Sequence, residues 1–398
     1  GKTVVALLSI LISIDNNYQS CLVAPTEILA FQHFKNFKDK FENLGLVVKV
    51  LTGSTKSSDR KILLNDLKNG SINLLIGTHA IFEQNVIFNN LGYAVIDEQH
   101  RFGVKQRSKI WEKNNPPPHV LIMTATPIPR TLTMSLYGDL DLSIIDELPP
   151  GRKDVITVHR KDKNRLKVFG FIRDQIKQGR QIYIVYPLIE ESKKMDLKYL
   201  EDGLESITRE FDKENFSIGV MHGRMRSSNK DIEMNNFLNG KIDILISTTV
   251  IEVGVNVPNA SVMIIENAER FGLSQLHQLR GRVGRGKYDS YCVLMTNDKI
   301  SEDAKIRIDA MVNSNDGFKI SEVDLRLRGP GDVLGTKQSG VLDFKIADII
   351  EDESILFSVS NEADLLIKKD PKLNLNENYN IRSFILNNPI NKSWNEIG

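Results

Sequence analysis

The chain has 398 residues, which is enough for two or three domains with separate cores. A composition that is 41% hydrophobic and 26% charged excludes a disordered or fibrous protein. The net charge is only +1, from 52 basic and 51 acidic residues, so any site for a polyanion must be a local patch.

The chain opens with Gly1, Lys2 and Thr3, the residue types that end a Walker A phosphate-binding loop. In such a loop the glycine permits close approach of the backbone, the lysine reaches the β and γ phosphates, and the hydroxyl binds Mg²⁺. Three residues alone are a weak signal, and their weight depends on a partner motif downstream.

An apolar run follows, from Val4 to Ile14, and we predict that it forms a buried helix. It is too short to span a bilayer and lacks the features of a signal peptide, so no membrane partner is expected. Cys21 and Cys292 lie in apolar runs without disulfide or zinc spacing, which fits a reducing cytoplasm.

Short β-branched runs then alternate with amphipathic segments, a pattern that predicts parallel sheets covered by helices. The first block of predicted strands covers residues 21–25, 45–52, 72–78, 93–98 and 120–126. In an open α/β sheet, ligands bind at the carboxyl ends of the strands. Residues there offer hydroxyls and backbone N–H groups for sequence-blind phosphate contacts, and we predict nucleic-acid contacts at Pro25, Thr26, Glu27, Thr52, Gly53, Thr78 and His79.

The sequence VIDEQH, residues 95–100, is an apolar strand that ends in two carboxylates. Asp97 can hold the Mg²⁺ that Thr3 contacts, and Glu98 can polarise the water that attacks a γ phosphate. A solvated acidic pair closing a strand is the plain alternative. The distance from Gly-Lys-Thr, about one domain, favours the catalytic interpretation.

Thr124 and Thr126 stand at another predicted strand end, in the segment MTATPIPRTL. Their hydroxyls can connect the hydrolysis site to the nucleic-acid side through hydrogen bonds. A local strand cap explains the same spacing equally well.

Residues 146–155, with Pro-Pro-Gly, predict a linker between two domains. The second block of predicted strands covers residues 181–187, 217–223, 243–249, 260–266 and 291–295. Its loop residues Thr248 and Thr249 are the predicted counterparts of the nucleic-acid contacts in the first block.

The segment LSQLHQLRGRVGRG, residues 273–286, predicts a helix capped by Ser274. Its helical periodicity would place Gln278, Arg282 and Arg285 on one stripe. A basic surface helix explains the charge but not the interleaved glycines. We therefore predict that Arg282 and Arg285 act as arginine fingers, supplied to the phosphates by the second domain.

After about residue 300 the β/α alternation stops. A helical segment SEDAKIRIDAMV precedes the Gly- and Pro-rich RLRGPGDVLG, and an Asn- and Lys-rich tail follows. The tail is compatible with a capping helix or with a partly frayed end, and the sequence does not decide between them.

Taken in order, GKT, APTEILA, DEQH, TAT, VIEVGVNVPNA and QLRGRVGR resemble the motif series of superfamily 2 helicases. The longer strings VIDEQHRFGVKQR, YPLIEESKKMDL and DGFKISEVDLRLRGPGDVLGTKQSG resemble the RecG family of bacterial ATP-dependent DNA helicases. The resemblance covers residues 1 to about 345.

The resemblance implies an α/β fold with two RecA-like parallel-sheet domains, a helical hairpin and a C-terminal helical segment. The corresponding ranges are 1–150, 151–299, 300–345 and 346–398. It implies an ATP-dependent translocase on double-stranded DNA that remodels stalled forks and Holliday junctions in recombination and repair. The implied cofactors are ATP and Mg²⁺. The resemblance also implies a monomer that binds branched and double-stranded DNA, with single-stranded DNA-binding protein as a further partner.

Further site residues come from the resemblance. It assigns Gly254 and Asn256 to nucleotide binding, although many relatives have Asp where Asn256 stands. It also assigns Gln278 to the catalytic set and Arg326, Arg328 and Gln338 to the coupling of hydrolysis to movement. Without the aspartate charge, Asn256 can still accept a hydrogen bond from a ribose hydroxyl.

Family members carry an N-terminal wedge domain and a complete phosphate loop, and neither is present in this sequence. We expect the chain to be a fragment that begins within the Walker A motif. Most of the backbone cradle for the phosphates is then missing, so we expect weak or absent ATP hydrolysis by these 398 residues alone.

Three other functions remain open. A transcription-repair coupling factor shares the two motor domains and the hairpin, but its box usually reads DEEH where Gln99 makes DEQH here. An RNA helicase has no need for the RLRGPGDVLG element. A non-catalytic nucleic-acid-binding module would not need to keep Lys2, Asp97, Glu98 and both arginines.

Overall fold

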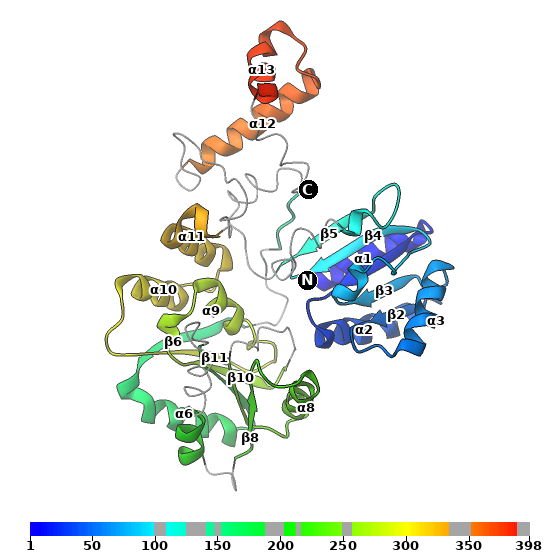
Figure 1. Cartoon of the computed structure of the whole chain (residues 1–398). Coiled ribbons are helices and arrows are strands. Elements are labelled where there is room, and N and C mark those ends of the chain that lie inside the picture. Colours follow the sequence, from blue (N-terminus) through cyan, green and yellow to red (C-terminus); the bar gives the residue numbers. More distant parts are fainter. Residues whose placement is uncertain are drawn as a thin grey trace. The chain divides into compact units, whose positions relative to one another are not determined.

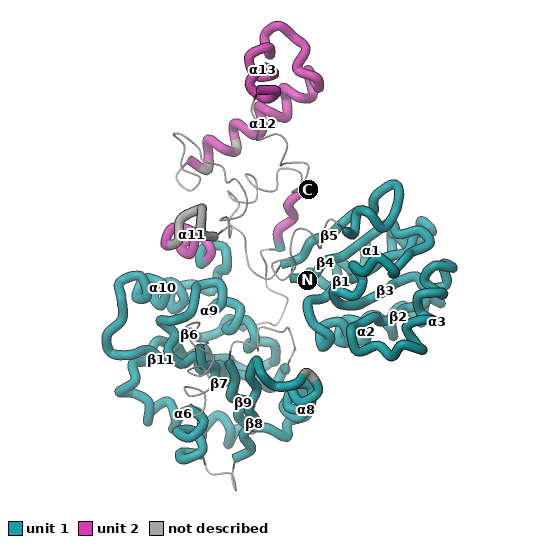
Figure 2. The backbone as a smooth tube through the Cα atoms, viewed as in Figure 1, with its two compact units in different colours: residues 1–126, 145–320 teal, residues 127–144, 321–398 magenta. Residues whose placement is uncertain are grey.

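The structure is a computed structural model that describes residues 1–98, 109–124, 141–145, 147, 153–187, 203–211, 216–248, 257–333 and 352–387. Contacts between Cα atoms divide the chain into two compact units (Figure 2). Residues 1–126 and 145–320 form the first, and residues 127–144 and 321–398 form the second.

Two all-parallel sheets lie in the first unit, as the alternating pattern predicts (Figure 1). The first sheet has the strand order β2-β3-β1-β4-β5. Its strands are β1 (Gln19–Val23), β2 (Val48–Leu51), β3 (Leu74–Gly77), β4 (Leu91–Asp97) and β5 (His119–Met123).

Helices cover both faces of this sheet, because side chains of a strand point alternately to opposite faces. Leu22 packs on one face with α1 (Lys2–Asp15) and α2 (Glu27–Glu42). Its neighbours Cys21 and Val23 pack on the other face with α3 (Ser57–Lys68) and η1 (His79–Phe82).

The prediction of a buried helix at the start of the chain is correct for one face only. Ala6, Ile10 and Ile14 of α1 are buried in the core. Four apolar residues on the other side of the helix are 46–65% exposed, because a helix of 3.6 residues per turn presents only one stripe to a single sheet. These exposed residues are Val4, Val5, Leu8 and Ile12.

The second sheet has the strand order β6-β11-β10-β7-β9-β8, and all its pairings are parallel. Every strand that the sequence predicts is present, with ends shifted by a few residues. The strands are β6 (Val155–Lys161), β7 (Gln181–Val185), β8 (Ile218–Met221), β9 (Ile244–Ser247), β10 (Ala260–Ile265) and β11 (Ser290–Thr296).

Strand β6 is an addition, since its first residue, Val155, falls in the segment predicted as a linker. It lies at the edge of the sheet, and only its first residue is buried, whereas the others are partly buried or exposed. His159 and Lys161 interrupt the apolar pattern by which the other strands are recognised.

The helices around this sheet are α6 (Arg165–Lys177), residues 203–210, α8 (Ser227–Leu238) and α9 (Leu273–Arg280), with short 3₁₀ turns η3 (Asp162–Asn164) and η5 (Ala268–Arg270). Phe169 of α6 and Phe211 pack edge to face, with ring centroids 5.7 Å apart, over the isoleucines of β7 and β9. On the other face, Tyr183 of β7 packs on Phe237 of α8 at 4.8 Å.

After the second sheet, all described secondary-structure elements are helices. The elements are α10 (Glu302–Asn313), α11 (Gly317–Val333), α12 (Glu353–Lys369), η6 (Asn376–Asn378) and α13 (Tyr379–Asn387). Residues 352–387 of the tail therefore contain two helices. Within the described residues, no helix combines the length and the apolar character needed to cross a bilayer.

Candidate nucleotide and nucleic-acid sites

The predicted site residues of the first sheet gather at one edge. Each follows the carboxyl end of a strand, and in a parallel sheet these ends lie on the same side. Residues 24–27 follow β1, 52–54 follow β2, 78 and 79 follow β3, Glu98 follows β4 and Thr124 follows β5.

Lys2 lies among the acidic residues of this edge. Its Nζ donates a hydrogen bond of 2.8 Å to the backbone oxygen of Thr124. Burial lowers the pKa of Lys2, while the nearby negative charges of Glu98 and Asp97 oppose that shift. The structure therefore brings together Lys2, Asp97, Glu98 and Thr124, from three separate motifs.

The two carboxylates at the end of β4 differ in their local structure. Asp97 Oδ2 lies 3.0 Å from Nε2 of His33, a residue that the sequence did not single out. Glu98 has a φ of 54°, in the left-handed region that non-glycine residues rarely adopt. This turn ends the strand directly behind Asp97, and such strain is typical of functional sites.

Mg²⁺ fits the oxygen donors at this edge. A threonine hydroxyl at Thr3 and a carboxylate at Asp97 are ligand types that Mg²⁺ accepts alongside water and phosphate oxygens. Among the residues that the structure describes, no cluster of three or more His, Cys, Asp or Glu side chains could hold a metal ion by itself. The donor set suits an ion that arrives with a nucleotide.

The loop after β2 is attached to the start of α2. Thr26 caps α2, with its hydroxyl accepting a hydrogen bond from the N–H of Leu29 at 3.4 Å. Glu27 accepts two hydrogen bonds from Ser54, one from its N–H at 3.0 Å and one from its hydroxyl at 2.7 Å. The hydroxyls of Thr52 and Ser54 lie 2.9 Å apart. Glu27 thus holds the loop that carries Thr52 and Gly53.

Two buried threonine hydroxyls stand at matching places in the two sheets. Thr78 follows β3 and is 2% exposed, and Thr248 follows β9 and is 3% exposed. Neither Oγ1 has a hydrogen-bond partner within the described residues. Because buried hydroxyls are usually hydrogen-bonded, both are suited to a ligand that supplies an acceptor.

The predicted helix at 273–286 is shorter than expected. Helix α9 begins at Leu273 with Gly272 as its N-cap, not Ser274, and ends at Arg280. Gln278 lies on the helix, whereas Arg282 and Arg285 follow it, so the three residues do not share a helical stripe.

Glycines end the helix. Gly281 is its C-cap, and Gly284 has a φ of +77°, where a Cβ would lie 2.8 Å from Val155. Arg282 is nearly buried and Arg285 is exposed, and the positive charge of both opposes the rise in the pKa of Tyr183 that burial causes. Both guanidinium groups therefore lie on the loop after α9, near the Tyr183 side of the second sheet.

The sequence did not reveal the role of a buried arginine at the end of α9. Arg280 is 3% exposed. Its guanidinium donates to the carbonyl oxygens of Met311 at 2.8 Å and Ser314 at 2.7 Å, and lies 3.1 Å from Nδ1 of His277. Ser314 is the C-cap of α10, so Arg280 ties α9 to the end of α10. Arg280 belongs to the same basic motif as Arg282, so nothing in the sequence suggested a structural contact for it.

We expect the Arg280→Met variant to lose about 3 kcal/mol of stability around α9 and α10, because each carbonyl left unpaired costs about 1–3 kcal/mol. Hydrogen exchange of α10 amides measures the loss. Arg173→Met is the matched control, since Arg173 is bound to Glu210 and partly exposed. It should cost less than about 1 kcal/mol. Equal exchange in both variants would contradict the assigned contact.

His277 should make the same region sensitive to acid. Burial, aided by the charge of Arg280 and opposed by that of Asp316, lowers the pKa of His277 to about 4. The unfolded chain takes up this proton near pH 6.5, so stability is complete above pH 6.5 and falls by up to about 1.4 kcal/mol per pH unit towards pH 4. In thermal unfolding between pH 7 and pH 5, His277→Gln should show a shallower pH dependence than the unchanged chain. Parallel curves would rule out this role.

Several predicted residues fall outside the described residues: Thr126, Thr249, Gly254, Asn256 and Gln338. Arg326 is exposed on α11, and Arg328 belongs to the same helix. Their assigned roles stay predictions.

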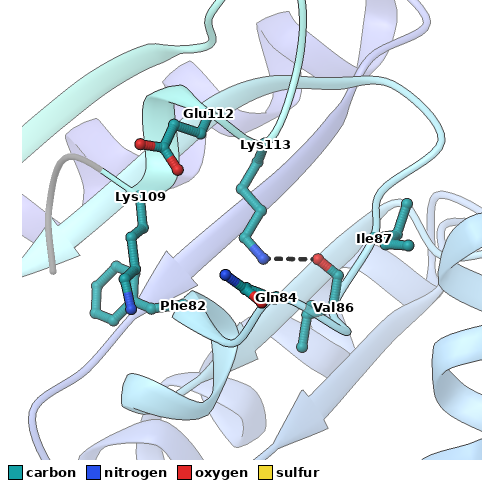
Figure 3. A pocket seen from close by; sticks show the side chains of 7 residues that line it. All are labelled: Phe82, Gln84, Val86, Ile87, Lys109, Glu112 and Lys113. Carbon is teal, nitrogen blue, oxygen red and sulfur yellow. Dashed lines mark hydrogen bonds between the residues drawn. The ribbon is translucent and has the colours of Figure 1, made fainter.

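One pocket contains none of the predicted site residues (Figure 3). The side chain of Lys113 enters this pocket. Its Nζ donates a hydrogen bond of 2.8 Å to the carbonyl oxygen of Val86 and another to that of Glu83. Lys113 therefore braces the loop after η1. The lining residues are Phe82, Gln84, Val86, Ile87, Lys109, Glu112 and Lys113.

Comparison with protein families gives three consecutive matches. A DEAD/DEAH box helicase model matches residues 1–135, and a helicase conserved C-terminal domain model matches residues 164–287. Residues 314–388 match a model for domain 3, C-terminal, of the ATP-dependent DNA helicase RecG.

Curated relatives agree with the third match. The ATP-dependent DNA helicase RecG of Synechocystis is 51% identical over 382 residues, which is 96% of this chain and 46% of the relative. The RecG of Bacillus subtilis is 48% identical and covers 93% of this chain and 54% of the relative. The chain thus spans about half the length of the curated relatives it matches.

Solved structures show the same relation. A structure of RecG bound to a three-way DNA junction has a TM-score of 0.73 and 44% identity, covering 89% of this chain and 46% of that one. The L327V variant of S. cerevisiae Dbp5 bound to RNA and ADP BeF3 has a TM-score of 0.58 at 15% identity, covering 82% of this chain and 86% of that one. The second likeness shows the fold alone.

Proposed function

This chain belongs to the RecG family of ATP-dependent DNA helicases, and from that premise we propose that it is the motor of a protein that remodels branched DNA. The observation that carries the proposal is the cluster of Lys2, Asp97, Glu98 and Thr124 at one sheet edge. The four residues come from motifs spread over 122 positions, yet they form one constellation suited to phosphate chemistry.

In this proposal Lys2 holds the β and γ phosphates of ATP, and Thr3 and Asp97 hold Mg²⁺. When bound, the ion would neutralise the charge that develops on the phosphates. Glu98 follows Asp97 directly in the chain. In this proposal its carboxylate orients the attacking water and accepts a proton from it. Arg282 and Arg285 stabilise the transferring phosphoryl group, and Gln278 with the predicted nucleotide-binding residues Gly254 and Asn256 completes the site.

Duplex DNA lies, in this proposal, along the carboxyl edges of both sheets. The buried hydroxyls of Thr78 and Thr248, which have no hydrogen-bond partner in the part of the chain that the structure describes, support phosphate contacts there. The other predicted contacts along this track are Pro25, Thr26, Thr52, Gly53, His79 and Thr249. In this proposal the chain is divided near residues 150, 300 and 345 into two motor domains, a hairpin and a C-terminal segment.

Movement is coupled to hydrolysis through the elements that follow α9. Arg280 supports this step, because it joins the loop of Arg282 to the end of α10. Arg326, Arg328 and Gln338 then act on DNA from α11 and the segment after it, assisted by Thr124 and Thr126 on the first domain.

A transcription-repair coupling factor is not favoured, because the match to RecG domain 3 covers residues 314–388. The likeness to RNA-bound Dbp5, at 15% identity, lends no support to an RNA substrate. A binding module without catalysis would not need a half-buried lysine beside two carboxylates.

ATP turnover by the complete protein tests the proposal, with forked DNA, linear duplex and single-stranded RNA compared at one salt concentration. Stimulation by forked DNA well above that by the other two is the expected result. Equal stimulation by linear duplex would favour the coupling factor, and a preference for RNA would overturn the assignment.

A further inference from the structure

Helix α2 contacts both sides of the first domain's site. Its first residue, Glu27, holds Ser54 of the loop on the proposed DNA track, with distances of 3.0 and 2.7 Å. Six residues later, His33 contacts the carboxylate of Asp97 at 3.0 Å. Less than two turns of helix therefore separate a DNA-facing loop from the carboxylate assigned to Mg²⁺.

The contact between His33 and Asp97 is shielded from water. The His33 side chain is 8% exposed and that of Asp97 is 13% exposed. A carboxylate oxygen accepts the hydrogen bond, so the N–H at Nε2 of His33 donates to Asp97. Nδ1 is buried and has no partner within the described residues, which leaves the bond to Asp97 as the polar contact of this side chain.

Helix α2 is firmly packed between the two contacts and beyond them. Leu29, Ala30, Phe37 and Phe41 of α2 are buried in the core beneath the sheet. Phe37 meets the His33 ring edge to face, with centroids 6.2 Å apart. Close-packed elements transmit small displacements instead of absorbing them.

We propose that His33 is a positioning residue for Asp97, and that α2 transmits contact with DNA from Ser54 and Glu27 to it. A partner that donates to a metal-binding carboxylate fixes its orientation, and loss of such a partner typically costs about 10–100-fold in metal affinity. A shift of the Ser54 loop by a DNA phosphate moves Glu27, α2 and His33 together. This inference rests on the proposed function for its DNA half, whereas the link from His33 to Asp97 stands on geometry alone.

Three substitutions at His33 test the first half in the complete protein. The readout is the Mg²⁺ concentration that gives half-maximal binding of ADP, measured with a fluorescent ADP analogue. His33→Leu removes the donor, and we expect about a tenfold rise in this concentration. His33→Gln places an amide nitrogen near the position of Nε2 and should restore it to within about threefold, whereas His33→Asn, with its nitrogen near Nδ1, should resemble His33→Leu.

The control is His119→Leu, because His119 is exposed at the amino end of β5, on the opposite edge of the sheet. It should leave the Mg²⁺ dependence unchanged. If His33→Leu does not fold, the pair His33→Gln and His33→Asn decides, since both keep a polar side chain. The same Mg²⁺ dependence in every His33 variant and the unchanged protein would overturn the assignment.

A double-mutant cycle tests the transmission through α2. Glu27→Ala and His33→Leu should each reduce the stimulation of ATP turnover by DNA, and the double variant should lose no more than the more severe single one. Additive losses would show two independent effects and overturn the coupling. If the unchanged protein hydrolyses no ATP with DNA, the proposed function fails, while the Mg²⁺-dependent binding of ADP still tests His33.

Discussion

Replacing Glu98 with Gln should reduce DNA-stimulated ATP turnover by about 10²–10⁴-fold, the usual contribution of a positioned general base. The amide has the same shape as the carboxylate but cannot take a proton from water. It also keeps the backbone at position 98, whose φ of 54° any replacement must adopt. Phosphate release measures turnover, and ADP affinity should stay within about threefold because Lys2 and Asp97 are intact.

Glu42→Gln is the matched control for this variant. Glu42 lies at the end of α2 in an exposed pair with Lys38, away from the sheet edge. Its turnover should equal that of the unchanged protein. A Glu98→Gln protein with full turnover would remove Glu98 from the mechanism, and a loss of ADP binding would mean that the variant changed the site itself.

Replacing Arg282 with Ala should reduce turnover by about 10³-fold or more, the effect expected of an arginine finger. Arg282 and Arg285 both follow α9 on a loop shaped by Gly284, which permits a conformation that other residues resist. The loss should appear in kcat, because a finger acts on charge that develops only in the transition state.

Arg270→Ala serves as the comparison, since Arg270 precedes α9 and belongs to neither predicted finger position. It should retain most of the turnover. Unchanged turnover in Arg282→Ala would exclude the finger, and a lowered unfolding temperature in that variant alone would indicate a packing role for its nearly buried side chain.

The sequence predicted the strands well because parallel strands buried on both faces are almost uniformly apolar. Residues 181–185 and 260–265 illustrate this, since every position is buried. Strand β6 escaped notice for the opposite reason, as an edge strand with His159 and Lys161 has no such pattern.

The site was predictable as far as it depends on strand ends. Lys2, Asp97 and Glu98 were found because their motifs have fixed positions relative to strands and helices. His33 and Arg280 were not found, because each acts through a contact between residues 31 or more positions apart, His33 with Asp97 and Arg280 with Met311 and Ser314. The shape of the 273–286 segment was also missed, since helical periodicity ignores the two glycines that end α9.

The two cysteines offer a way to observe the motor at work. Cys21 and Cys292 are fully buried, and burial raises the pKa of each thiol to about 12. At pH 7.5 only about one thiol in 10⁴ to 10⁵ would be ionised, and neither can reach a maleimide dye. These 398 residues thus contribute no reactive thiol of their own, so one cysteine added to the surface of each sheet domain can be labelled selectively within them. Energy transfer between the two dyes would then report the separation of the two sheet domains.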